Sequence, residues 1–348
     1  MRFFILLIRI LIVLLLRIDF CLSFEKRAFV TVVTIEDDVE PAMAMGSSLR
    51  ALTRTSDSVH NSEYSIDYIC LVIRKEDVSN QDKSADGDKS IGVSILGMKK
   101  LGFAGWSTRP VSHSISNINS DSENWEDVDF NLVWLWSLSE YHKVAYIDND
   151  MLIIQDIKEL FENDVHFAAA PQILSSHKFD TGLLVIRPDM STFTDMLSRT
   201  VKTGVEPSWD FEDFANDFFS DWYAMSQDHR LLPIYNAPYY WTQNESWVKF
   251  RSDIKVIHFS GEEKPWLILR DPNRFQVSKY GAPLIYVWAI LLYFIANPLG
   301  DGLEDETRYV MNEIFDVTKT SKKVFQYIEK MKRGGTRMRI GIHDNEEL

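Results

Sequence analysis

An apolar run interrupted by two carboxylates constrains this chain most. Residues 143–154 read KVAYIDNDMLII, so Asp148 and Asp150 stand between two segments of core-type residues. In an extended segment, side chains two apart share one face, and neighbouring carboxylates repel each other. A bound cation relieves that repulsion, and oxygen ligands of this kind suit Mg2+ or Mn2+, which suit the phosphates of a nucleotide. The pattern predicts an enzyme that handles a diphosphate through a metal.

The segments before this run predict the opening of a parallel α/β sheet. Residues 28–34 and 68–73 are β-branched runs typical of strands, and the spacing over residues 41–52 suits a helix between them. Strand, helix and strand in this order open such sheets. A Trp-rich helix over residues 130–138 then places a strand at 141–147. Its carboxyl end carries the two aspartates, where ligands bind in these folds.

Composition bounds the class of protein. The 348 residues are 45% hydrophobic and 13% aromatic, enough for one large domain with appendages or two smaller ones. A net charge of −14 argues against binding a phosphate backbone, so nucleic acid is not an expected partner. Removal of an N-terminal segment containing Cys21 would leave only Cys70, so no disulfide framework is expected. Cys70 lies in an apolar run and is predicted to be inert core.

The N-terminus predicts the secretory pathway. Residues 1–23 combine a positive start, an apolar run too short to span a bilayer and a small-residue cleavage site. This is typical of a signal peptide, with an uncleaved signal anchor as the alternative. The triplet beginning at Asn244 is a glycosylation sequon compatible with that route. The Golgi or ER lumen is therefore the expected location, with a membrane anchor in the second case.

A second apolar segment, residues 281–300, holds no charge and could nearly span a bilayer. Basic residues precede it and acidic residues follow it, the reverse of what a lumenal catalytic domain would want. A transmembrane segment and a packed helix therefore both stay open. Residues 301–348 form a charged tail.

Residues 255–266, KVIHFSGEEKPW, supply further chemistry. His258 ends an apolar strand, and imidazole can complete a carboxylate metal site. Gly261 lets backbone amides approach phosphate, and Lys264 neutralises the charge that grows as a diphosphate departs.

These motifs, with AFVTVVT, WSLSEYHKVAYIDNDMLIIQDIKELF and FDTGLLVIRPDMSTF, resemble family 8 glycosyltransferases. That group includes glycogenins and the plant glucuronosyltransferases that decorate xylan. The resemblance covers residues 27–271 and implies a GT-A fold, a Rossmann-like α/β domain with a mixed, mainly parallel central sheet. It also implies retaining transfer of a hexosyl or glucuronosyl group from a UDP-sugar, with Mn2+ or Mg2+, to a hydroxyl of a glycan, lipid or protein acceptor.

Residue roles follow from the same resemblance. The metal ligands would be Asp148, Asp150 and His258. The residues that bind the donor would be Thr34, Asn149, Thr181, Gly261 and Lys264. The residues that act on the transferred sugar or on the leaving group would be Glu212, Asp180 and Lys264.

The sequence departs from the family where the sugar is handled. Asp180-Thr181-Gly182 stands where the family shows Asn-Ser-Gly, and Phe211-Glu212-Asp213 aligns with its Asp-Gln-Gly motif. Leu132 replaces a lysine expected near the donor. Either the site is degraded, or it is rebuilt for another sugar that packs on the Phe211 ring.

Two alternative functions are also compatible with parts of the sequence. A phosphohydrolase of the haloacid dehalogenase type also uses Asp-x-Asp after a strand, but its motif usually lies near the start of the domain. A noncatalytic sugar-nucleotide binder is suggested by Phe211 and Leu132.

Overall fold

The computed structural model describes residues 25–53, 64–75, 92–111, 130–201, 209–244, 247–271, 274–275, 277–278 and 280–296. The predicted signal segment 1–23, the tail 301–348 and the last two residues of the sequon lie outside this part. The strands are β1 (Glu25–Val33), β2 (Tyr64–Val72), β3 (Ser107–Pro110), β4 (Lys143–Ile147), β5 (Met151–Ile153), β6 (Phe167–Pro171), β7 (Phe179–Ile186), β8 (Ala237–Pro238) and β9 (Val256–His258).

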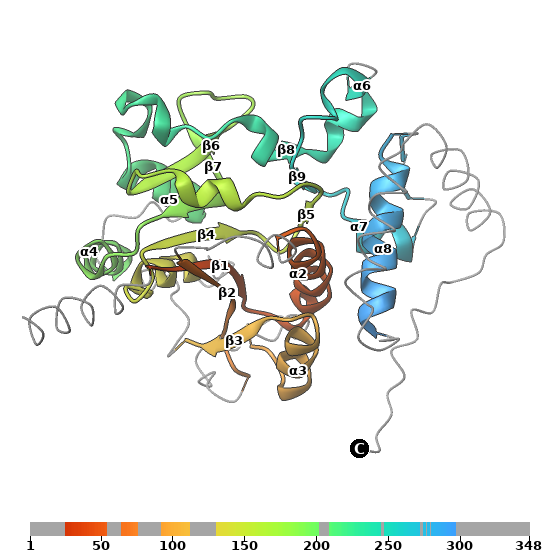
Figure 1. Ribbon diagram of the computed structural model, residues 1–348, viewed down its shortest axis with the longest axis horizontal. Coiled ribbons are helices and arrows are strands. Elements are labelled where there is room, and N and C mark those ends of the chain that lie inside the picture. The colour runs from red at the N-terminus through yellow and green to blue at the C-terminus, as the bar shows by residue number, and fades with distance from the viewer. Residues whose placement is uncertain are drawn as a thin grey trace, which may run out of the picture.

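Helices connect and cover these strands (Figure 1). The α-helices are α2 (Val39–Thr53), α3 (Ile95–Phe103), α4 (Met190–Val201), α5 (Phe211–Phe218), α6 (Trp247–Phe250), α7 (Pro265–Arg270) and α8 (Ala282–Ala296). Short 3-10 helices are η1 (Glu36–Asp38), η3 (Asn131–Ser137), η4 (Lys158–Glu162), η5 (Trp222–Ala224), η6 (Gln227–His229), η7 (Pro233–Tyr235) and η8 (Tyr239–Gln243).

The central sheet has six strands in the order β3-β2-β1-β4-β7-β6. β3, β2, β1 and β4 run parallel, whereas β7 is antiparallel to both β4 and β6. A second sheet, β5-β9-β8, continues beyond the end of β4. The predicted α/β class with a mixed, mainly parallel sheet is confirmed.

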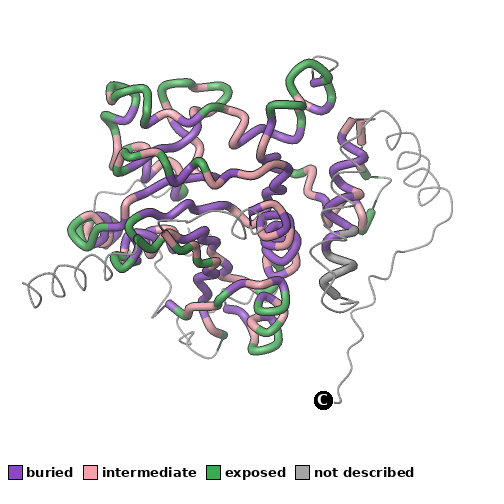
Figure 2. The backbone as a smooth tube through the Cα atoms, viewed as in Figure 1, coloured by how far each residue is buried: buried purple, intermediate pink, exposed green. Residues whose placement is uncertain are grey.

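Alternating side chains bury both faces of the central sheet. On β4, Ala145 and Ile147 join the core cluster that includes α2 and α8, whereas Val144 and Tyr146 join the cluster that includes η3, α4 and α5. Strands with buried residues on both faces are typical of sheets covered by helices on each side. Figure 2 shows these strands as the buried centre of the molecule. The sheet is therefore a rigid support whose strand ends carry the polar residues.

The sequence suggested that Asp148 and Asp150 lie on one extended segment, but the structure places them in a turn. β4 ends at Ile147 and β5 begins at Met151, so Asp148 and Asp150 occupy the turn where the chain leaves the large sheet for the small one. In the small sheet, Met151 is the register partner of His258. This crossover brings the two predicted ligand segments together.

Other expectations were met with adjustments. The predicted strands and the first helix are present, but the Trp-rich segment forms the 3-10 helix η3 rather than an α-helix. Cys70 is fully buried, and burial raises the pKa of its thiol, as expected of inert core.

The apolar segment at 281–300 is helical from Ala282 to Ala296, in α8. Trp288 of α8 is buried against Trp266 of α7, with ring centroids 5.7 Å apart, and Ile285 and Leu291 are buried with it. Among the described residues, the helices are too short or too polar to cross a membrane.

Candidate metal and diphosphate site

Three predicted ligands meet beyond the carboxyl end of β4. One ligand atom from each of Asp148, Asp150 and His258 lies within 4.8 Å of the others. Asp150 and His258 are buried, and His258 Nε2 lies 3.3 Å from Asp150 Oδ1. The structure therefore gathers two carboxylates and an imidazole in one partly enclosed site.

The site fits a divalent cation. Asp150 Oδ1 is buried and has no hydrogen-bond partner among the described residues, an arrangement that costs free energy unless a further ligand satisfies the oxygen. Two carboxylates and one imidazole form a donor set suited to Mn2+ or Mg2+. Such a cation would supply positive charge that binds and neutralises a diphosphate.

The pKa shifts within this cluster also indicate an excess of negative charge that a cation could offset. Burial raises the pKa of Asp148, and the charge of Asp150 raises it further, to about 7. Burial opposes ionisation of Asp150 as well, but His258 and Lys264 outweigh it and lower the pKa of Asp150 to about 2. Burial lowers the pKa of His258, but Asp150 more than compensates and raises it to about 9. Without a metal, protons on Asp148 and His258 offset the negative charge of the site. A bound cation would offset that charge in their place.

Lys264 lies at the edge of the cluster. Its ammonium donates to Asp150 Oδ2 and, at 2.7 Å, to the carbonyl oxygen of Phe259. Lys264 directly precedes the first residue of α7, Pro265, which suits the start of a helix. Gly261, between β9 and Lys264, has φ +82°, a conformation that favours glycine. The loop therefore presents a cation and a glycine-shaped turn beside the metal ligands.

Asn236 is a site residue that the sequence reasoning missed. Its Oδ1 lies 2.8 Å from His258 Nδ1, and its Nδ2 donates to Asp180 Oδ1 at 2.7 Å. With Nδ1 donating to Asn236, the Nε2 atom of His258 faces the carboxylates, which is the orientation that a metal ligand needs. No spacing rule links a residue 22 positions upstream to His258, and only the pairing of β8 with β9 brings them together.

The predicted sugar-handling residues also lie nearby. Asp180 Oδ1 accepts from the backbone N–H of Gly182 at 2.8 Å and lies 3.8 Å from His258 Nδ1. Glu212 accepts from Gln172 at 2.6 Å and from the backbone N–H of Thr181 at 3.0 Å. Burial, followed by the charge of Asp180, raises the pKa of Glu212. Both carboxylates are held by fixed donors.

Phe211 does not offer an aromatic face to a sugar, and that expectation was wrong. The side chain is only 6% exposed and packs in the core cluster that includes η3, α4 and α5, with its ring centroid 6.2 Å from that of Phe214. Leu132 packs against the same cluster. Asp210 caps α5 by accepting from the backbone N–H of Asp213, which fixes where the helix begins and leaves Glu212 directed to Thr181.

The remaining predicted residues occupy the same edge of the sheet. Thr34 follows β1, whose parallel pairing with β4 brings their carboxyl ends together, and its carbonyl accepts from Gly92 at 2.7 Å. The backbone N–H of Asn149 donates to Asp148 Oδ1 at 2.7 Å. A Cβ on Gly182 would lie 2.6 Å from Met151 Cε and 2.8 Å from His258 Cε1, so only glycine fits beside the ligand.

A mixed α/β sheet with this acidic metal cluster beyond a strand end is the arrangement expected of a GT-A nucleotide-sugar transferase. Residues 106–269 match the model of the family described as Glycosyl transferase family 8. This part of the chain is therefore similar to family 8 glycosyltransferases, which confirms the predicted resemblance.

Three curated relatives illustrate the similarity. Glycogenin-1 of Caenorhabditis elegans is 32% identical over 141 residues, which cover 40% of this chain and 32% of that protein. Putative UDP-glucuronate:xylan alpha-glucuronosyltransferase 3 of Arabidopsis thaliana is 29% identical over 181 residues, 48% of this chain and 27% of the relative. Glycogenin-1 of Mus musculus is 25% identical over 261 residues, 72% of this chain and 69% of the relative. This chain thus spans less than a third of the worm and plant relatives.

Among solved structures, the glycosyltransferase GlyE in Streptococcus pneumoniae TIGR4 matches with a TM-score of 0.46 and 18% identity, covering 84% of this chain and 64% of that chain.

Proposed function

We propose that this protein transfers a sugar from a UDP-sugar to an acceptor hydroxyl, with a divalent metal held by Asp148, Asp150 and His258. The observation that carries the proposal is the buried Oδ1 of Asp150, which makes no hydrogen bond of normal geometry and faces His258 Nε2 at 3.3 Å, in a segment that matches the family 8 model. A metal at this position would bind the diphosphate and stabilise the charge of departing UDP.

Other residues of the chain would bind the donor and stabilise the leaving group. Lys264 would turn from Asp150 to a phosphate oxygen and stabilise the leaving group electrostatically, and Gly261 would let backbone amides approach it. Thr34, Asn149 and Thr181 would line the donor along the strand ends. Asp180 and Glu212 would accept hydrogen bonds from sugar hydroxyls, because ionised carboxylates only accept.

The donor class is proposed as a UDP-hexose or UDP-glucuronate, since the named relatives include glycogenins and a UDP-glucuronate transferase. We favour Mn2+ over Mg2+ because a histidine ligand suits manganese better than magnesium, which prefers oxygen alone. We also propose retention of anomeric configuration, as the family resemblance implies.

A panel of donors tests the function. The purified chain is incubated with UDP-glucose, UDP-glucuronate and UDP-galactose in Mn2+, in Mg2+ and in EDTA, and released UDP is measured. Metal-dependent UDP release from at least one donor is expected. UDP binding without turnover would indicate the noncatalytic binder, and phosphate release from simple phosphate esters would indicate the phosphohydrolase.

The secretory placement is likewise a proposal, supported by residues 1–23 and by Asn244, which is exposed at the end of η8. In sealed microsomes from cells that express the full chain, the domain should resist added protease. Its digestion without detergent would contradict the placement.

A further inference from the structure

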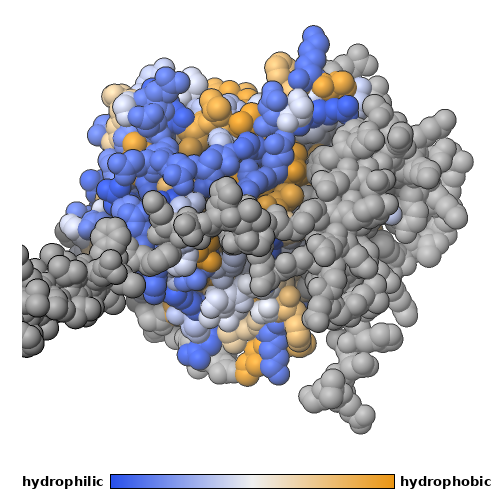
Figure 3. Space-filling view, viewed as in Figure 1, coloured by the Kyte–Doolittle hydropathy of each residue, from blue (hydrophilic) through white to orange (hydrophobic). Residues whose placement is uncertain are grey.

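The outer face of α3 exposes three large apolar side chains. Ile95, Leu96 and Phe103 are 57%, 58% and 74% exposed, and Lys99 is exposed between them. These four positions share one face of the helix, because residues three and four apart lie one above the other. We call them the α3 patch. Figure 3 shows hydrophobic and hydrophilic atoms side by side over α3, at the lowest part of the molecule in that view.

The helix that carries the α3 patch is held in place at its start and along its inner face. Ser94 caps it by accepting from the backbone N–H of Gly97 at 2.9 Å. Glu36 accepts from the backbone N–H and from the hydroxyl of Ser94, at 2.7 and 2.9 Å. Leu101 is fully buried in the core cluster that includes α2 and α8. The apolar side chains therefore protrude from an ordered helix.

Basic residues lie beside the α3 patch. Arg74 forms a β-bridge with Val93, and the backbone N–H of Lys75 donates to the Val93 carbonyl at 3.1 Å. Together with residues of the first turn of α3, these two basic residues line a groove of about 350 Å³. Residues 92–111 contain lysine and arginine but neither aspartate nor glutamate, in a chain whose net charge is −14. The surface around α3 therefore combines apolar groups with local positive charge.

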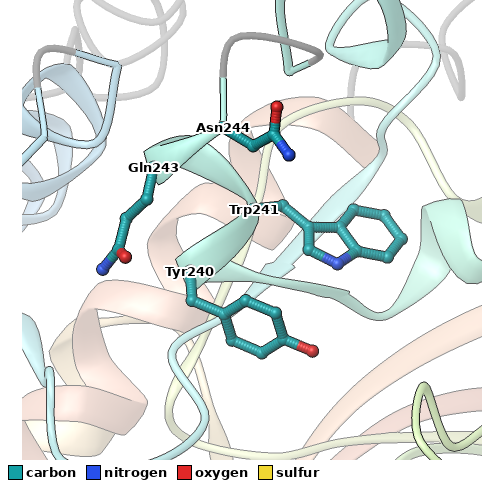
Figure 4. A pocket seen from close by; sticks show the side chains of 4 residues that line it. All are labelled: Tyr240, Trp241, Gln243 and Asn244. Carbon is teal, nitrogen blue, oxygen red and sulfur yellow. The ribbon is translucent and has the colours of Figure 1, made fainter.

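The exposed aromatic surface on η8 lacks this combination. It is formed by Tyr240, Trp241, Gln243 and Asn244, and neither lysine nor arginine is among these four. Figure 4 shows Gln243 directed away from the two rings, and its amide donates to the carboxylate of Glu263. Of these two surfaces, α3 is the one that pairs apolar side chains with positive charge.

This combination fits the surface of an anionic membrane. Helices with large apolar side chains and lysines bind at the boundary between lipid headgroups and acyl chains, and anionic lipids strengthen that binding. A second copy of this chain fits less well, because a two-fold interface places the same patch on both sides and would bring the α3 lysines together. The apolar side chains also protrude at both ends of α3, and a fluid lipid layer accepts separate side chains without a matching shape.

We infer that the α3 patch binds the surface of an anionic membrane, with its apolar side chains among the headgroups and its lysine facing lipid phosphates. A helix of nine residues would lie on the membrane without spanning it. Gly92, close to the start of α3, donates to the carbonyl of Thr34 at 2.7 Å. Binding through α3 would therefore hold the carboxyl end of β1 near the lipid surface.

Flotation of the full chain with lipid vesicles gives the first test. Vesicles of phosphatidylcholine are compared with vesicles that also contain phosphatidylserine. The variant Ile95→Ser/Leu96→Ser/Phe103→Ser should bind the anionic vesicles at least about tenfold more weakly than wild type, because less apolar area enters the lipid. Val248→Ser/Phe250→Ser is the matched control, since these side chains are 43% and 58% exposed on α6, and it should bind as wild type does.

A local probe separates α3 from the apolar segments near the ends of the chain. Gly102→Cys places a thiol on the patch face of α3, where a Cβ meets nothing within 4 Å. Cys21→Ser removes one competing thiol, and Cys70 is buried. An environment-sensitive fluorophore attached at position 102 should shift its emission to the blue when anionic vesicles are added. Lys99→Gln should weaken binding to these vesicles about fivefold, because one cation is lost.

Three results would overturn the inference. They are equal flotation of wild type and the triple α3 variant, an unshifted fluorophore at position 102, and equal wild-type binding to vesicles with and without phosphatidylserine. Self-association without vesicles that the triple variant abolishes would assign the patch to a second copy instead and would also overturn it. Neither measurement uses a sugar donor, so its outcome is independent of the proposed transferase function.

Discussion

The site has a proposed metal half, formed by Asp148, Asp150 and His258, and a proposed sugar half, formed by Asp180 and Glu212. The two halves differ in how far their polar groups are already hydrogen-bonded. At the junction of β4 and β5, Asp150 Oδ1 is buried and makes no hydrogen bond of normal geometry, with His258 Nε2 3.3 Å away. Asp180, at the start of β7, and Glu212, in α5, are each held by two hydrogen bonds from the protein. The proposed metal ligands therefore include an oxygen that a cation could satisfy, whereas both carboxylates of the proposed sugar half are already held by the protein.

The departures from the family motifs lie in the core and in α5. Phe211 stands where the family motif has a carboxylate, but its side chain lies in the core and offers no exposed ring face to a ligand. Glu212, next in the chain, keeps a carboxylate near Asp180. Asp180 and Glu212 therefore remain two carboxylates that could accept hydrogen bonds from the hydroxyls of a sugar.

The largest expected effect concerns Phe211. Phe211→Asp should lower the free energy of unfolding by about 3 kcal/mol or more, because it places a carboxylate in a packed aromatic cluster. Chemical denaturation measures this. Phe103→Asp is the control, since the Phe103 ring is 74% exposed, and it should change stability by less than about 0.5 kcal/mol. Equal stabilities for the two variants would contradict the buried position of Phe211.

Asn236 links the two halves, because its side chain hydrogen-bonds to both Asp180 and His258. Asn236→Ala should weaken Mn2+-dependent UDP binding by about ten- to a hundredfold, because His258 loses the acceptor that orients its ring. Asn244→Ala, an equal change at an exposed amide on the same segment, should leave that affinity unchanged. Similar metal affinities for Asn236→Ala and wild type would show that the two halves are independent.

Proton competition should appear only in the metal half. The pKa of His258 is raised to about 9 from an ordinary 6.5, so its proton stabilises the metal-free fold fully below pH 6.5 and that contribution is lost as pH rises through about 9. A metal must displace this proton. Affinity for Mn2+ should therefore rise by up to about tenfold per pH unit between about pH 7 and about pH 8, and more steeply below about pH 7, where Asp148 also binds a proton. A flat calorimetric profile over that range would exclude His258 as a ligand.

A smaller effect is expected at the diphosphate loop. Gly261→Ala should cost about 1 kcal/mol of stability, because φ is +82° there, although a Cβ would meet nothing within 4 Å. Gly102→Ala, in α3 and equally open, should instead stabilise the fold by up to about 1 kcal/mol. Thermal unfolding of both variants gives the comparison, and equal shifts would contradict the strained turn.

The sequence predicted the parts of the fold and site that local patterns encode. Apolar runs located the strands of the parallel half, and the ends of β4 and β9 located the carboxylates and His258. Local patterns could not reveal the crossover from β4 to β5, since it depends on pairing with a strand about 100 residues later. Phe211 could have been placed better, because Phe211, Phe214 and Phe218 recur at the spacing of one helix face.

The central claim is that a divalent metal held by the metal half carries nucleotide binding. Titration calorimetry with UDP and Mn2+ tests it directly, comparing wild type with Asp150→Asn and with Asp195→Asn, the same change at an exposed aspartate on α4. We predict Mn2+-dependent binding in wild type and Asp195→Asn, abolished by EDTA and weakened by more than about a hundredfold in Asp150→Asn. UDP affinity that is equal in all three proteins, or unaffected by EDTA, would contradict the account.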